Sequence, residues 1–413
     1  MTAGDLQNFL EKAFTPGPPD GLGVAVSGGG DSMALLHLAV DWAREGGPKV
    51  AAVTVDHRLR PEAAEEARFV AETCTRLGVA HDTLVWDHGD IDGNLQDQAR
   101  RARYRLIGDW ARGRGLSHVA LGHTADDQAE TFLMELARKA GLDGLSGMRG
   151  SWIEGGIRWT RPLLAVSRRD LRAVLTARGA SWVEDPSNRD DRFTRVKARR
   201  VLEALAPLGI TADTLCTVAE RLGQARAALV QVTAEAAAAH ARTAAGAVRI
   251  PREVFLRGLS PEVARRFLVG ALLWVARADY PPRSEAVDRV LCAIRDLNAV
   301  TLGGCSIRVT EDEIAVTREP RAIAGLESGT DGLWDGRWRM RGPHESGLTV
   351  RALGAEGLAQ CPDWRETGHS RAALVVTPAI WRGDTLVAAP LAGRAEGWTA
   401  EIVISFGSFL IAH

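Results

Sequence analysis

A glycine-rich turn is the part of this sequence whose residues most directly suggest chemistry. Residues 27–32 read Ser-Gly-Gly-Gly-Asp-Ser, after a short apolar run and before a longer apolar-periodic one. Glycine adopts backbone angles that are closed to other residues, so consecutive N–H groups can converge on an anion at the positive end of the following helix. The pattern therefore predicts a phosphate site formed by Ser27, Gly28, Gly29, Gly30, Asp31 and Ser32.

Two common nucleotide-binding loops do not fit this turn. No lysine follows the glycines, as the kinase-type loop requires, and the dinucleotide fingerprint needs a further glycine where Ser32 or Met33 stands. An aspartate that faces phosphates is a natural ligand for Mg²⁺, so we expect Asp31 to hold this ion. A glycine turn without any ligand is the alternative.

A second group of reactive side chains begins another helix. Residues 121–131 run from a β-type segment into a helical one and contain His123, Asp126, Asp127 and Glu130. Asp127 and Glu130 are three residues apart and share a helical face, which suits either Mg²⁺ or an ammonium group. Such a carboxylate pair can also bind and deprotonate an amine. Acidic residues are favoured at helix starts by capping and by the helix dipole, so a purely structural role is the alternative.

A third group follows a different apolar run. Asp56, His57 and Arg60 come directly after residues 53–55, which read as the end of a strand. We expect them at the same edge of a sheet as the glycine turn, near a bound nucleotide.

Arginine is concentrated in two segments. Along 94–105 the spacing puts Arg100 and Arg103 on one helical face, where they could contact phosphates of RNA or ATP. Residues 158–200 carry twelve Lys and Arg against five Asp and Glu, in a chain whose net charge is −1. Such an excess favours an RNA partner, and a solvated basic face is the alternative in both segments.

The elements that must position these groups alternate regularly in the first half of the chain. β-type runs lie at 22–27, 49–55, 81–86 and 117–121, and helical patterns at 32–45, 61–77 and 94–113. This alternation predicts an α/β fold with a doubly wound parallel sheet, covered on both faces. Because ligands of such sheets bind beyond the carboxyl ends of the strands, we expect the three groups to meet at one edge.

The second half of the chain has a different texture. Alanine-rich helical patterns at 211–243, 261–277 and 283–297 precede a hairpin pattern at 301–318, and further hairpins are expected at 333–340 and 377–386. We predict three domains: a catalytic α/β domain at 1–205, a helical domain at 206–320 and a small β-rich domain at 321–413.

Composition limits the class of protein. The chain has 413 residues, 46% of them hydrophobic and 25% charged, which is typical of a water-soluble protein of several domains. No apolar run reaches the length of a bilayer crossing and the N-terminus lacks signal-peptide features, so we expect a cytoplasmic protein without a membrane partner. The five scattered cysteines form no Cys-x-x-Cys pair, which argues against a disulfide framework, a zinc finger and an iron–sulfur cluster.

Taken in order, the motifs resemble those of the tRNA(Ile)-lysidine synthetase family, within the N-type ATP pyrophosphatases of the PP-loop superfamily. Ser-Gly-Gly-x-Asp-Ser alone marks the superfamily. Four further motifs are close to family-specific: Val-Asp-His-x-Leu-Arg at 55–60, Gly-His-x-x-Asp-Asp-Gln-x-Glu-Thr at 122–131, Arg-Pro-Leu-Leu at 161–164 and Glu-Asp-Pro-Ser-Asn at 184–188. The resemblance in motifs covers residues 1–205, and beyond them it is one of organisation only.

The chain departs from the family pattern at two places. The family commonly has Arg-Asn-x-x-Arg where this chain has Val196 between Arg195 and Lys197, with Arg199 at the end. It also commonly has a glycine where this chain has Lys139. Both arginines of the first motif remain, whereas any contact made by the asparagine side chain is lost.

The resemblance implies an enzyme that uses ATP and Mg²⁺. It would adenylate the ring carbonyl of the first anticodon cytidine in a tRNA(Ile) with a CAU anticodon, and free L-lysine would then displace AMP, changing decoding from AUG to AUA. A homodimer is compatible with the sequence. The resemblance implies that the cofactor is bound by Ser27 to Ser32, Asp56, His57 and His123, and the metal by Asp31 and Asp127. It implies that lysine is bound by Asp127 and Glu130, and that the catalytic residues are Asp31, Asp127, Arg195 and Arg199. The implied tRNA contacts are Arg100, Arg103, Arg161 and Arg200, together with the helical domain.

Two other readings stay open. One is a different PP-loop enzyme that adenylates tRNA, although a thiolase would be expected to carry catalytic cysteines near the motifs. The other is a non-catalytic module that binds ATP and RNA, which would have no need of Asp31, Asp127 and Glu130 together. Replacement of Asp31 by Ala separates them, because an enzyme loses turnover while a binding module keeps its activity.

Overall fold

The computed structural model describes residues 1–59, 62–88, 95–184 and 194–412. Arg60 and most of the motif at 184–188 therefore lie outside the described residues. The chain forms two compact units, Met1–Arg226 and Ala227–His413. The predicted division into three domains, with boundaries after 205 and 320, stays a prediction.

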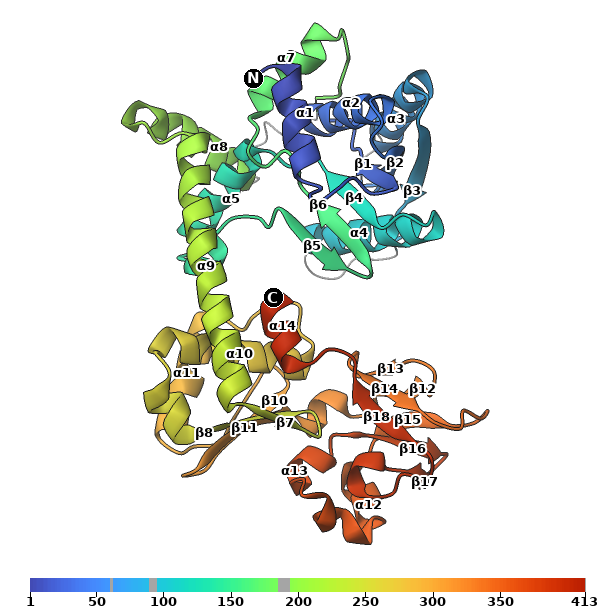
Figure 1. The fold of residues 1–413 in the computed structure, drawn as a ribbon, viewed down its shortest axis with the longest axis vertical. Helices are drawn as coiled ribbons and strands as arrows, with labels where there is room; N and C mark the ends of the chain where they lie inside the picture. The colour runs from blue at the N-terminus through green and yellow to red at the C-terminus, as the bar shows by residue number, and fades with distance from the viewer. Residues whose placement is uncertain (60–61, 89–94, 185–193, 413) are drawn as a thin grey trace. The chain divides into compact units, whose positions relative to one another are not determined.

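The first unit is built on a six-stranded sheet with the order β3-β2-β1-β4-β6-β5 (Figure 1). Its strands are β1 (Gly21–Ala25), β2 (Lys49–Asp56), β3 (Ala80–Val85), β4 (His118–Leu121), β5 (Ser151–Glu154) and β6 (Ile157–Thr160). All neighbours are parallel except β5 and β6, which form an antiparallel hairpin. The predicted doubly wound parallel sheet is confirmed, and the edge strand β5 is an antiparallel addition, since Gly155 and Gly156 both adopt positive φ and close the hairpin.

Helices cover both faces of this sheet: α1 (Ala3–Lys12), α2 (Gly30–Arg44), α3 (Glu62–Leu77) and α7 (Arg168–Ala177) pack on one face and α4 (Leu95–Gly113) on the other. The unit also contains α5 (Ala125–Ala137), α6 (Leu142–Leu145), α8 (Thr194–Leu205), the 3₁₀ turn η2 (Ala206–Leu208) and the beginning of α9 (Ala212–His240).

Alternation along the strands divides the core between the two faces. Leu22 and Val24 of β1 pack in one apolar cluster with α1, α2, α3 and α7, whereas Ala25 packs with α4 and Trp159 in another. Burial of both faces accounts for the apolar character of the central strands. Because β1, β2 and β4 are parallel, their carboxyl ends meet at one edge of the sheet. The glycine turn, His57 and His123 extend from this edge.

The second unit begins with a five-stranded antiparallel sheet and two long helices. Its strands are β7 (Arg242–Ala244), β8 (Ala247–Pro251), β11 (Glu313–Arg318), β10 (Cys305–Val309) and β9 (Val300–Leu302), in this spatial order. Its helices are the π-helical η3 (Val254–Gly258), α10 (Pro261–Ala276) and α11 (Ser284–Arg295). The helices predicted at 211–243, 261–277 and 283–297 are confirmed as α9, α10 and α11. The expected single hairpin at 301–318 is instead part of a three-strand meander, β9-β10-β11.

Two small antiparallel sheets complete this unit. One has the order β12-β15-β16-β17 and the other β13-β14-β18, so a strand-rich C-terminal part is confirmed. The strands are β12 (Ser328–Gly329), β13 (Leu333–Trp334), β14 (Trp338–Arg341), β15 (Thr349–Ala352), β16 (Pro378–Arg382), β17 (Thr385–Ala388) and β18 (Thr399–Ile402). The helices are η4 (Pro320–Ile323), α12 (Gly354–Ala359), η5 (Pro362–Thr367), α13 (Arg371–Leu374), η6 (Pro390–Ala392) and α14 (Phe406–Ala412).

Residues from distant parts of the chain complete the core of the second unit. Phe406 of α14 contacts Phe267 of α10, with ring centroids 5.5 Å apart, and also Trp274 at 5.6 Å. Gly270 lies so close to Leu410 that a Cβ there would be 2.3 Å from the leucine Cδ2. The core around α10 is therefore closed by residues more than 100 positions later in the chain.

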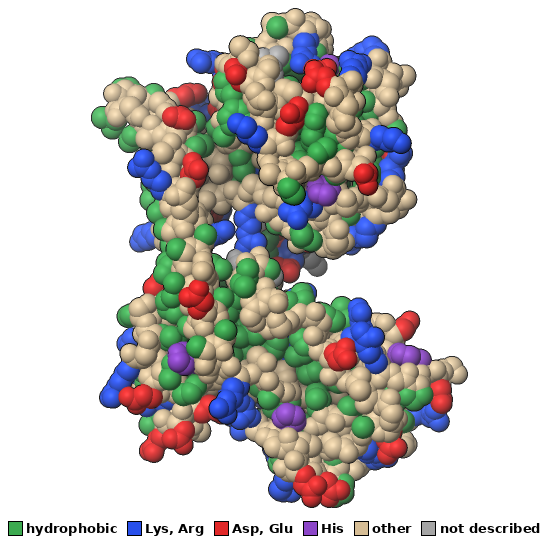
Figure 2. Space-filling model, viewed as in Figure 1, with side chains coloured by type: hydrophobic (Ala, Val, Ile, Leu, Met, Phe, Trp, Pro, Cys, Tyr) green, Lys and Arg blue, Asp and Glu red, His purple; other side chains and the backbone are tan. Residues whose placement is uncertain are grey.

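Acidic and basic side chains are interspersed on the face of each unit seen in Figure 2. Over the residues that the structure describes, no single helix has the length and apolar character needed to cross a bilayer. One bent pair, Thr194–Leu208 with Ala212–His240, meets the length and composition test, but its two helices make an angle of 98°.

Candidate active site

The glycine turn joins β1 to α2 and is held by a small hydrogen-bond network. Gly28 has φ +87°, which favours glycine, and Gly29 caps α2 with an extended backbone. The Ser32 hydroxyl accepts from the Ser27 N–H at 3.1 Å and donates to the Gly29 carbonyl at 3.0 Å. The turn therefore leaves its remaining N–H groups at the positive end of α2, as a phosphate site requires.

A neighbouring strand end touches this turn directly. A Cβ on Gly122 would lie 2.9 Å from the Cα of Ser32 and 3.1 Å from the carbonyl oxygen of Asp31. Only a residue without a side chain allows this approach. It brings the start of α5, with its acidic residues, next to the start of α2.

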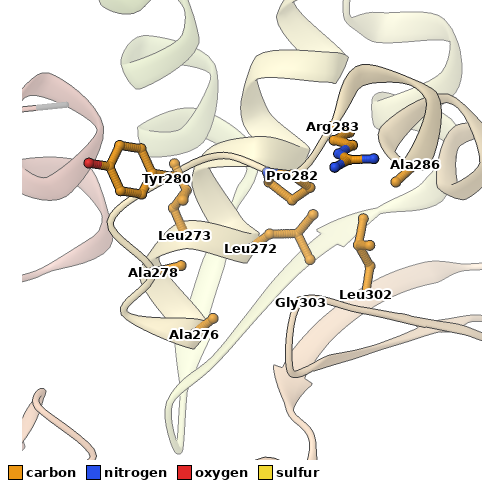
Figure 3. Close-up of a pocket in the computed structure, with 10 residues that line it drawn as sticks. All are labelled: Leu272, Leu273, Ala276, Ala278, Tyr280, Pro282, Arg283, Ala286, Leu302 and Gly303. Atoms are coloured by element: carbon orange, nitrogen blue, oxygen red, sulfur yellow. The ribbon is translucent and has the colours of Figure 1, made fainter. Parts of the chain in front are cut away.

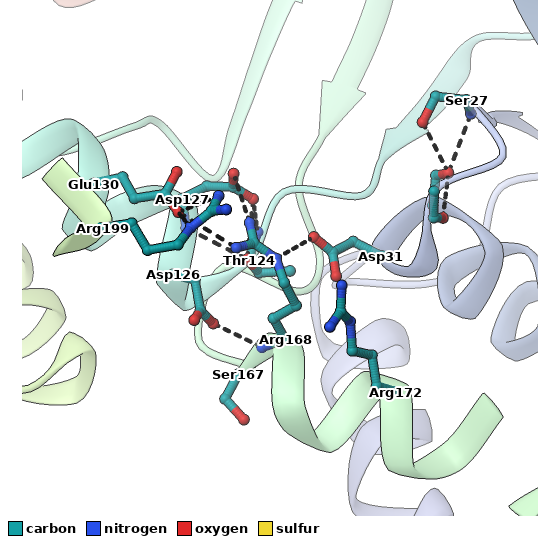
Figure 4. Close-up of polar contacts among 12 residues, drawn as sticks. Ser27, Asp31, Thr124, Asp126, Asp127, Glu130, Ser167, Arg168, Arg172 and Arg199 are labelled. Carbon is teal, nitrogen blue, oxygen red and sulfur yellow. Dashed lines mark hydrogen bonds and ion pairs between the residues drawn. The ribbon is translucent and has the colours of Figure 1, made fainter. Parts of the chain in front are cut away.

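Arg168 joins the acidic residues of the two helices (Figure 4). Its Nε donates to Asp31 Oδ2 at 3.0 Å, its Nη2 to Asp127 Oδ1 at 3.3 Å and its Nη1 to Glu130 Oε1 at 3.3 Å. Its backbone N–H donates to Asp126 Oδ2 at 2.7 Å. Burial alone would lower the pKa of Arg168, but Asp31, Asp127 and Glu130 together raise it, so the guanidinium stays charged. Arg168 was not among the site residues expected from the sequence.

Asp127 has both a structural and an electrostatic role. Its Oδ2 accepts from the N–H and the hydroxyl of Thr124, which forms the capping box of α5. Its Oδ1 faces Arg168 and lies 3.8 Å from Nη1 of Arg195. Burial alone would raise the pKa of Asp127, but Arg168 and the Thr124 N–H hold it below its ordinary value. Asp127 is therefore an ionised carboxylate, as an ammonium or metal ligand must be.

Glu130 is buried and paired. Only 1% of it is exposed, and its Oε1 accepts from Nε and Nη2 of Arg199 at 3.0 and 2.9 Å as well as from Arg168. The structure thus brings together Asp31, Asp127, Glu130, Arg195 and Arg199, as expected. Arg195 and Arg199 come from α8, which packs against α5.

Asp31 is the carboxylate best suited to a metal ion. Its Oδ1 is buried and has no hydrogen-bond partner in the described part of the chain, although Oδ2 is paired with Arg168. Burial raises the pKa of Asp31, and Arg168 partly offsets this rise. Mg²⁺ is commonly held by one or two carboxylates together with substrate phosphates, and Asp31 fits such a site. The described residues contain no cluster of three or more His, Cys, Asp or Glu that could hold a metal on its own.

His123 and Arg161 form a buried pair beside this cluster. The Nε of Arg161 donates to His123 Nδ1 at 3.1 Å, and its other nitrogens donate to the Arg149 carbonyl and the Tyr104 hydroxyl. Burial, together with Arg161, lowers the pKa of His123 to about 3, so the imidazole is neutral. Arg161 is only 7% exposed and lies over the ring of Trp152. Arg161 therefore supports the histidine from inside the unit, and the predicted contact with tRNA stays a prediction.

The other predicted site residues are more dispersed. Arg100 and Arg200 are exposed on α4 and α8, whereas Arg103 is half-buried and lines the same cavity as His57. Burial lowers the pKa of both Arg103 and His57. Asp56 accepts from the Arg58 N–H at 2.8 Å and is not among the cavity-lining residues. The structure thus separates Arg103 from the exposed Arg100, although both lie on α4.

A large cavity connects these groups within the first unit. It has a volume of about 1180 Å³ and is lined by the glycine turn, the strand ends of β1, β2 and β4, and residues of α3, α4, α5, α7 and α8. Asp31, Asp127, Arg168, Arg195 and Arg199 all face it. A nucleotide and part of a second substrate can therefore reach the acidic cluster from one space.

The second unit has a smaller cavity of another character (Figure 3). It measures about 320 Å³ and is lined mainly by apolar side chains of α10, of the loop before α11 and of the β9–β10 turn. Among its lining residues Arg283 is the charged one. This lining contains no carboxylate, histidine or cysteine.

Comparisons with known proteins find relatives along nearly the whole chain. The model of the PP-loop domain family matches residues 3–205. The tRNA(Ile)-lysidine synthase of Ruegeria pomeroyi is 48% identical over 400 residues, which cover 97% of this chain and 95% of the relative. The enzyme of the same name from a Bradyrhizobium species is 37% identical and covers 78% of this chain and 98% of the relative.

Among solved structures, a U34-tRNA thiolase from Methanococcus maripaludis overlaps with 54% of this chain and 79% of its own, at 13% identity and a TM-score of 0.47. The match to the Ruegeria relative runs along nearly the whole of both chains. The chain therefore belongs to the tRNA(Ile)-lysidine synthase family.

Proposed function

We propose that this chain joins free L-lysine to the first anticodon cytidine of a tRNA(Ile) with a CAU anticodon, with ATP as the second substrate. The product base would pair with A in place of G, so decoding would change from AUG to AUA. The observation that carries the proposal is the cavity that the glycine turn, Asp31 and Asp127 share, in a chain of this family. An enzyme acting on tRNA would work in the cytoplasm.

In the first step the ring carbonyl oxygen of the cytidine attacks the α-phosphorus of ATP and pyrophosphate leaves. The N–H groups of residues 27–32 would bind the phosphates, and the guanidinium groups of Arg195 and Arg199 would stabilise the charge that develops on them. Asp31 and Asp127 would hold Mg²⁺, which when bound neutralises phosphate charge. His57, His123 and Asp56 would complete the nucleotide site from the neighbouring strand ends.

In the second step the ε-amine of lysine attacks the activated ring carbon and AMP leaves. A carbonyl oxygen is a poor leaving group, and adenylation makes it a good one. Asp127 is held ionised by Arg168, so it can bind the lysine ammonium before the amine gives up a proton. Glu130 shapes this lysine site by holding Arg168 and Arg199.

The tRNA would be bound outside the cavity by exposed cations. Arg100 and Arg200 are exposed and would contact tRNA phosphates, whereas Arg103 lines the cavity and would lie nearer the target base. The base must leave its loop to reach Asp31, as bases do for enzymes that modify them. Residues 206–320 are proposed to assist in binding the tRNA.

The proposal is tested by incorporation of labelled lysine into an unmodified CAU-anticodon tRNA(Ile), with and without ATP, using the intact chain and its Asp31→Ala variant. ATP-dependent labelling that disappears in the variant supports it. Release of AMP and pyrophosphate without labelling would point to another nucleophile. Absence of any ATP cleavage would point to a binding module.

A further inference from the structure

The hydrogen bond between Arg161 and His123 has a direction that chemistry fixes. The Nε of Arg161 lies 3.1 Å from Nδ1 of His123. A guanidinium group only donates hydrogen bonds, so Nδ1 must accept and carries no hydrogen. A neutral imidazole has one ring hydrogen, which then belongs to Nε2. The contact therefore selects one tautomer of His123.

The guanidinium of Arg161 is itself held in a single position. Its Nη1 donates to the Arg149 carbonyl at 2.7 Å and its Nη2 to the Tyr104 hydroxyl at 3.3 Å. The group also lies over the ring of Trp152, 4.3 Å from the ring centroid. Rotation of this buried side chain would leave a charge without partners in the protein interior, which is costly. The donor that faces His123 is therefore fixed.

The charges around His123 keep its ring neutral. Burial and the neighbouring Arg161 lower the pKa of His123 to about 3, and Arg103 and Arg195 act in the same direction. Asp127 opposes them and does not prevail. A second ring hydrogen would sit on Nδ1 and point at the guanidinium, so the imidazolium form is excluded by geometry as well as by charge.

The other ring nitrogen of His123 is available to the large cavity of the first unit. His123 lines this cavity together with the glycine turn. In the described part of the chain Nε2 makes no hydrogen bond, and it is not among the fully buried polar atoms. The preceding residue, Gly122, lies so near the start of α2 that a Cβ there would be 3.0 Å from the N of Ser32. An N–H donor thus faces the space next to the phosphate site.

We propose that Arg161 is a positioning residue that locks His123 in the tautomer protonated at Nε2, so that the neutral ring donates a hydrogen bond to a phosphate oxygen of bound ATP. Phosphate oxygens accept hydrogen bonds, whereas the opposite tautomer would present a lone pair to them. The role toward ATP rests on the proposed function. The choice of tautomer rests on the contacts of the protein alone.

The tautomer is tested by nuclear magnetic resonance of the intact chain without nucleotide, labelled with ¹⁵N in histidine and arginine. The signals of His123 are identified by their loss in His123→Asn. We expect a hydrogen on Nε2, none on Nδ1, and a scalar coupling from the Arg161 Nε–H across the hydrogen bond to Nδ1. At about pH 8 a histidine of ordinary pKa is neutral as well, so the spectrum reports the tautomer and not the charge.

The consequence for ATP is tested by calorimetric titration of the intact chain with ATP, without tRNA or lysine. Arg161→Met removes the donor but keeps most of the apolar side chain, and should weaken ATP binding at least about tenfold, the size of one hydrogen bond to a charged group. The amide of glutamine can place an N–H near the position of Nε2, whereas that of asparagine is too short. His123→Gln should therefore bind ATP at least about threefold more tightly than His123→Asn.

Arg158→Met is the matched control. Arg158 lies on β6, the strand that precedes Arg161, and its side chain is exposed and does not line the cavity. The substitution is the same and removes the same charge, so it should change ATP affinity by less than about twofold, since exposed charges are screened. Circular dichroism and thermal unfolding would establish that each variant is folded.

Three outcomes would overturn the proposal. A hydrogen on Nδ1 of His123 in the unaltered protein would refute the tautomer. Folded Arg161→Met that binds ATP as well as Arg158→Met would refute the positioning role, and a loss of tRNA affinity alone would make Arg161 an RNA contact instead. If Arg161→Met does not fold, the His123 pair still decides, because His123→Gln that binds no better than His123→Asn would exclude a donor at Nε2. Failure of the proposed function would be seen separately, as ATP binding without lysine labelling.

Discussion

Replacement of Gly122 by Ala should test whether the two halves of the active site are fixed to each other by backbone contact. The added Cβ would lie 2.9 Å from the Cα and 3.0 Å from the N of Ser32, and 3.1 Å from the carbonyl oxygen of Asp31. These are backbone atoms of the first turn of α2, so no side chain can rotate away to make room. Gly122 is not among the residues with positive φ, so its backbone suits alanine and the cost is steric.

Overpacking of this kind costs about 1–3 kcal/mol. For a unit the size of Met1–Arg226, each kcal/mol corresponds to roughly 2–4 °C, so the first unit should unfold about 2–12 °C lower. The start of α2 must also shift by several tenths of an ångström, which moves Asp31 against Arg168. Because small misplacements of reacting groups are costly, we expect ATP turnover to fall about 10- to 100-fold.

The assay combines scanning calorimetry with hydrogen exchange of peptides from β1 and α2, which reports on the first unit alone. Gly113→Ala is the matched control, because Gly113 ends α4, is exposed and has nothing within 4 Å of its Cβ position. That variant should be as stable as the unaltered protein or up to about 1 kcal/mol more stable. If Gly122→Ala unfolds at the same temperature as Gly113→Ala and cleaves ATP at the normal rate, the contact does not fix the site.

Three further predictions concern single side chains. Asp31→Ala should abolish ATP-dependent lysine labelling. The affinity for tRNA, measured by retention on a filter, should change less than about twofold, since Asp31 faces the cavity and not the proposed tRNA surface. Retained labelling would exclude Asp31 from the reaction. Asp127→Asn should raise the KM for lysine at least about tenfold, because a charge-assisted contact is lost. Glu130→Gln should lower kcat more than it raises the KM for lysine, because Glu130 holds Arg199. An equal rise of this KM in both variants would make Glu130 a direct ligand of lysine. Because the pKa of His123 is about 3 in the folded protein against 6.5 in the unfolded chain, its contribution to stability is complete above pH 6.5 and is lost toward pH 3. His123→Asn should therefore remove up to about 1.4 kcal/mol per pH unit from the slope of unfolding free energy below pH 6, measured by urea unfolding. An unchanged slope in this variant would contradict the reasoning.

The central part of the fold could be predicted because its determinants are local. The runs that became β1 to β4 are short and apolar, and each is followed by a helical pattern, so strand–helix alternation was visible without any tertiary information. The direction of β5 was not visible in this way. It depends on the turn at Gly155 and Gly156, and strands of four residues such as β5 and β6 carry little periodicity.

The candidate site was predictable where a motif joins a strand to a helix, and hidden where contacts come from distant segments. Asp31 and Asp127 lie in the first turn, and Glu130 in the second turn, of helices that follow strands, which placed them at one edge. Arg168 is 137 residues from Asp31 and stood within an arginine-rich segment, so its contacts could not be distinguished from those of its neighbours. Its one local signal was the Ser167 cap, which marks a helix start near the same edge. The buried position of Arg161 likewise depends on its contacts with Trp152 and Tyr104. No spacing pattern in the sequence relates these two residues to Arg161.

The contact between α14 and α10 has a consequence for how the protein is made. The first unit has all of its residues once position 226 has been synthesised, and it can fold while translation continues. The second unit lacks part of its core until Phe406, Phe409 and Leu410 have left the ribosome, although the apolar face of α10 that they cover is present from residue 276 onward. During this interval the nascent chain exposes apolar surface that the complete protein buries. A nonsense or frameshift mutation close to codon 400 should therefore yield a folded nucleotide-binding unit attached to a segment that proteases remove.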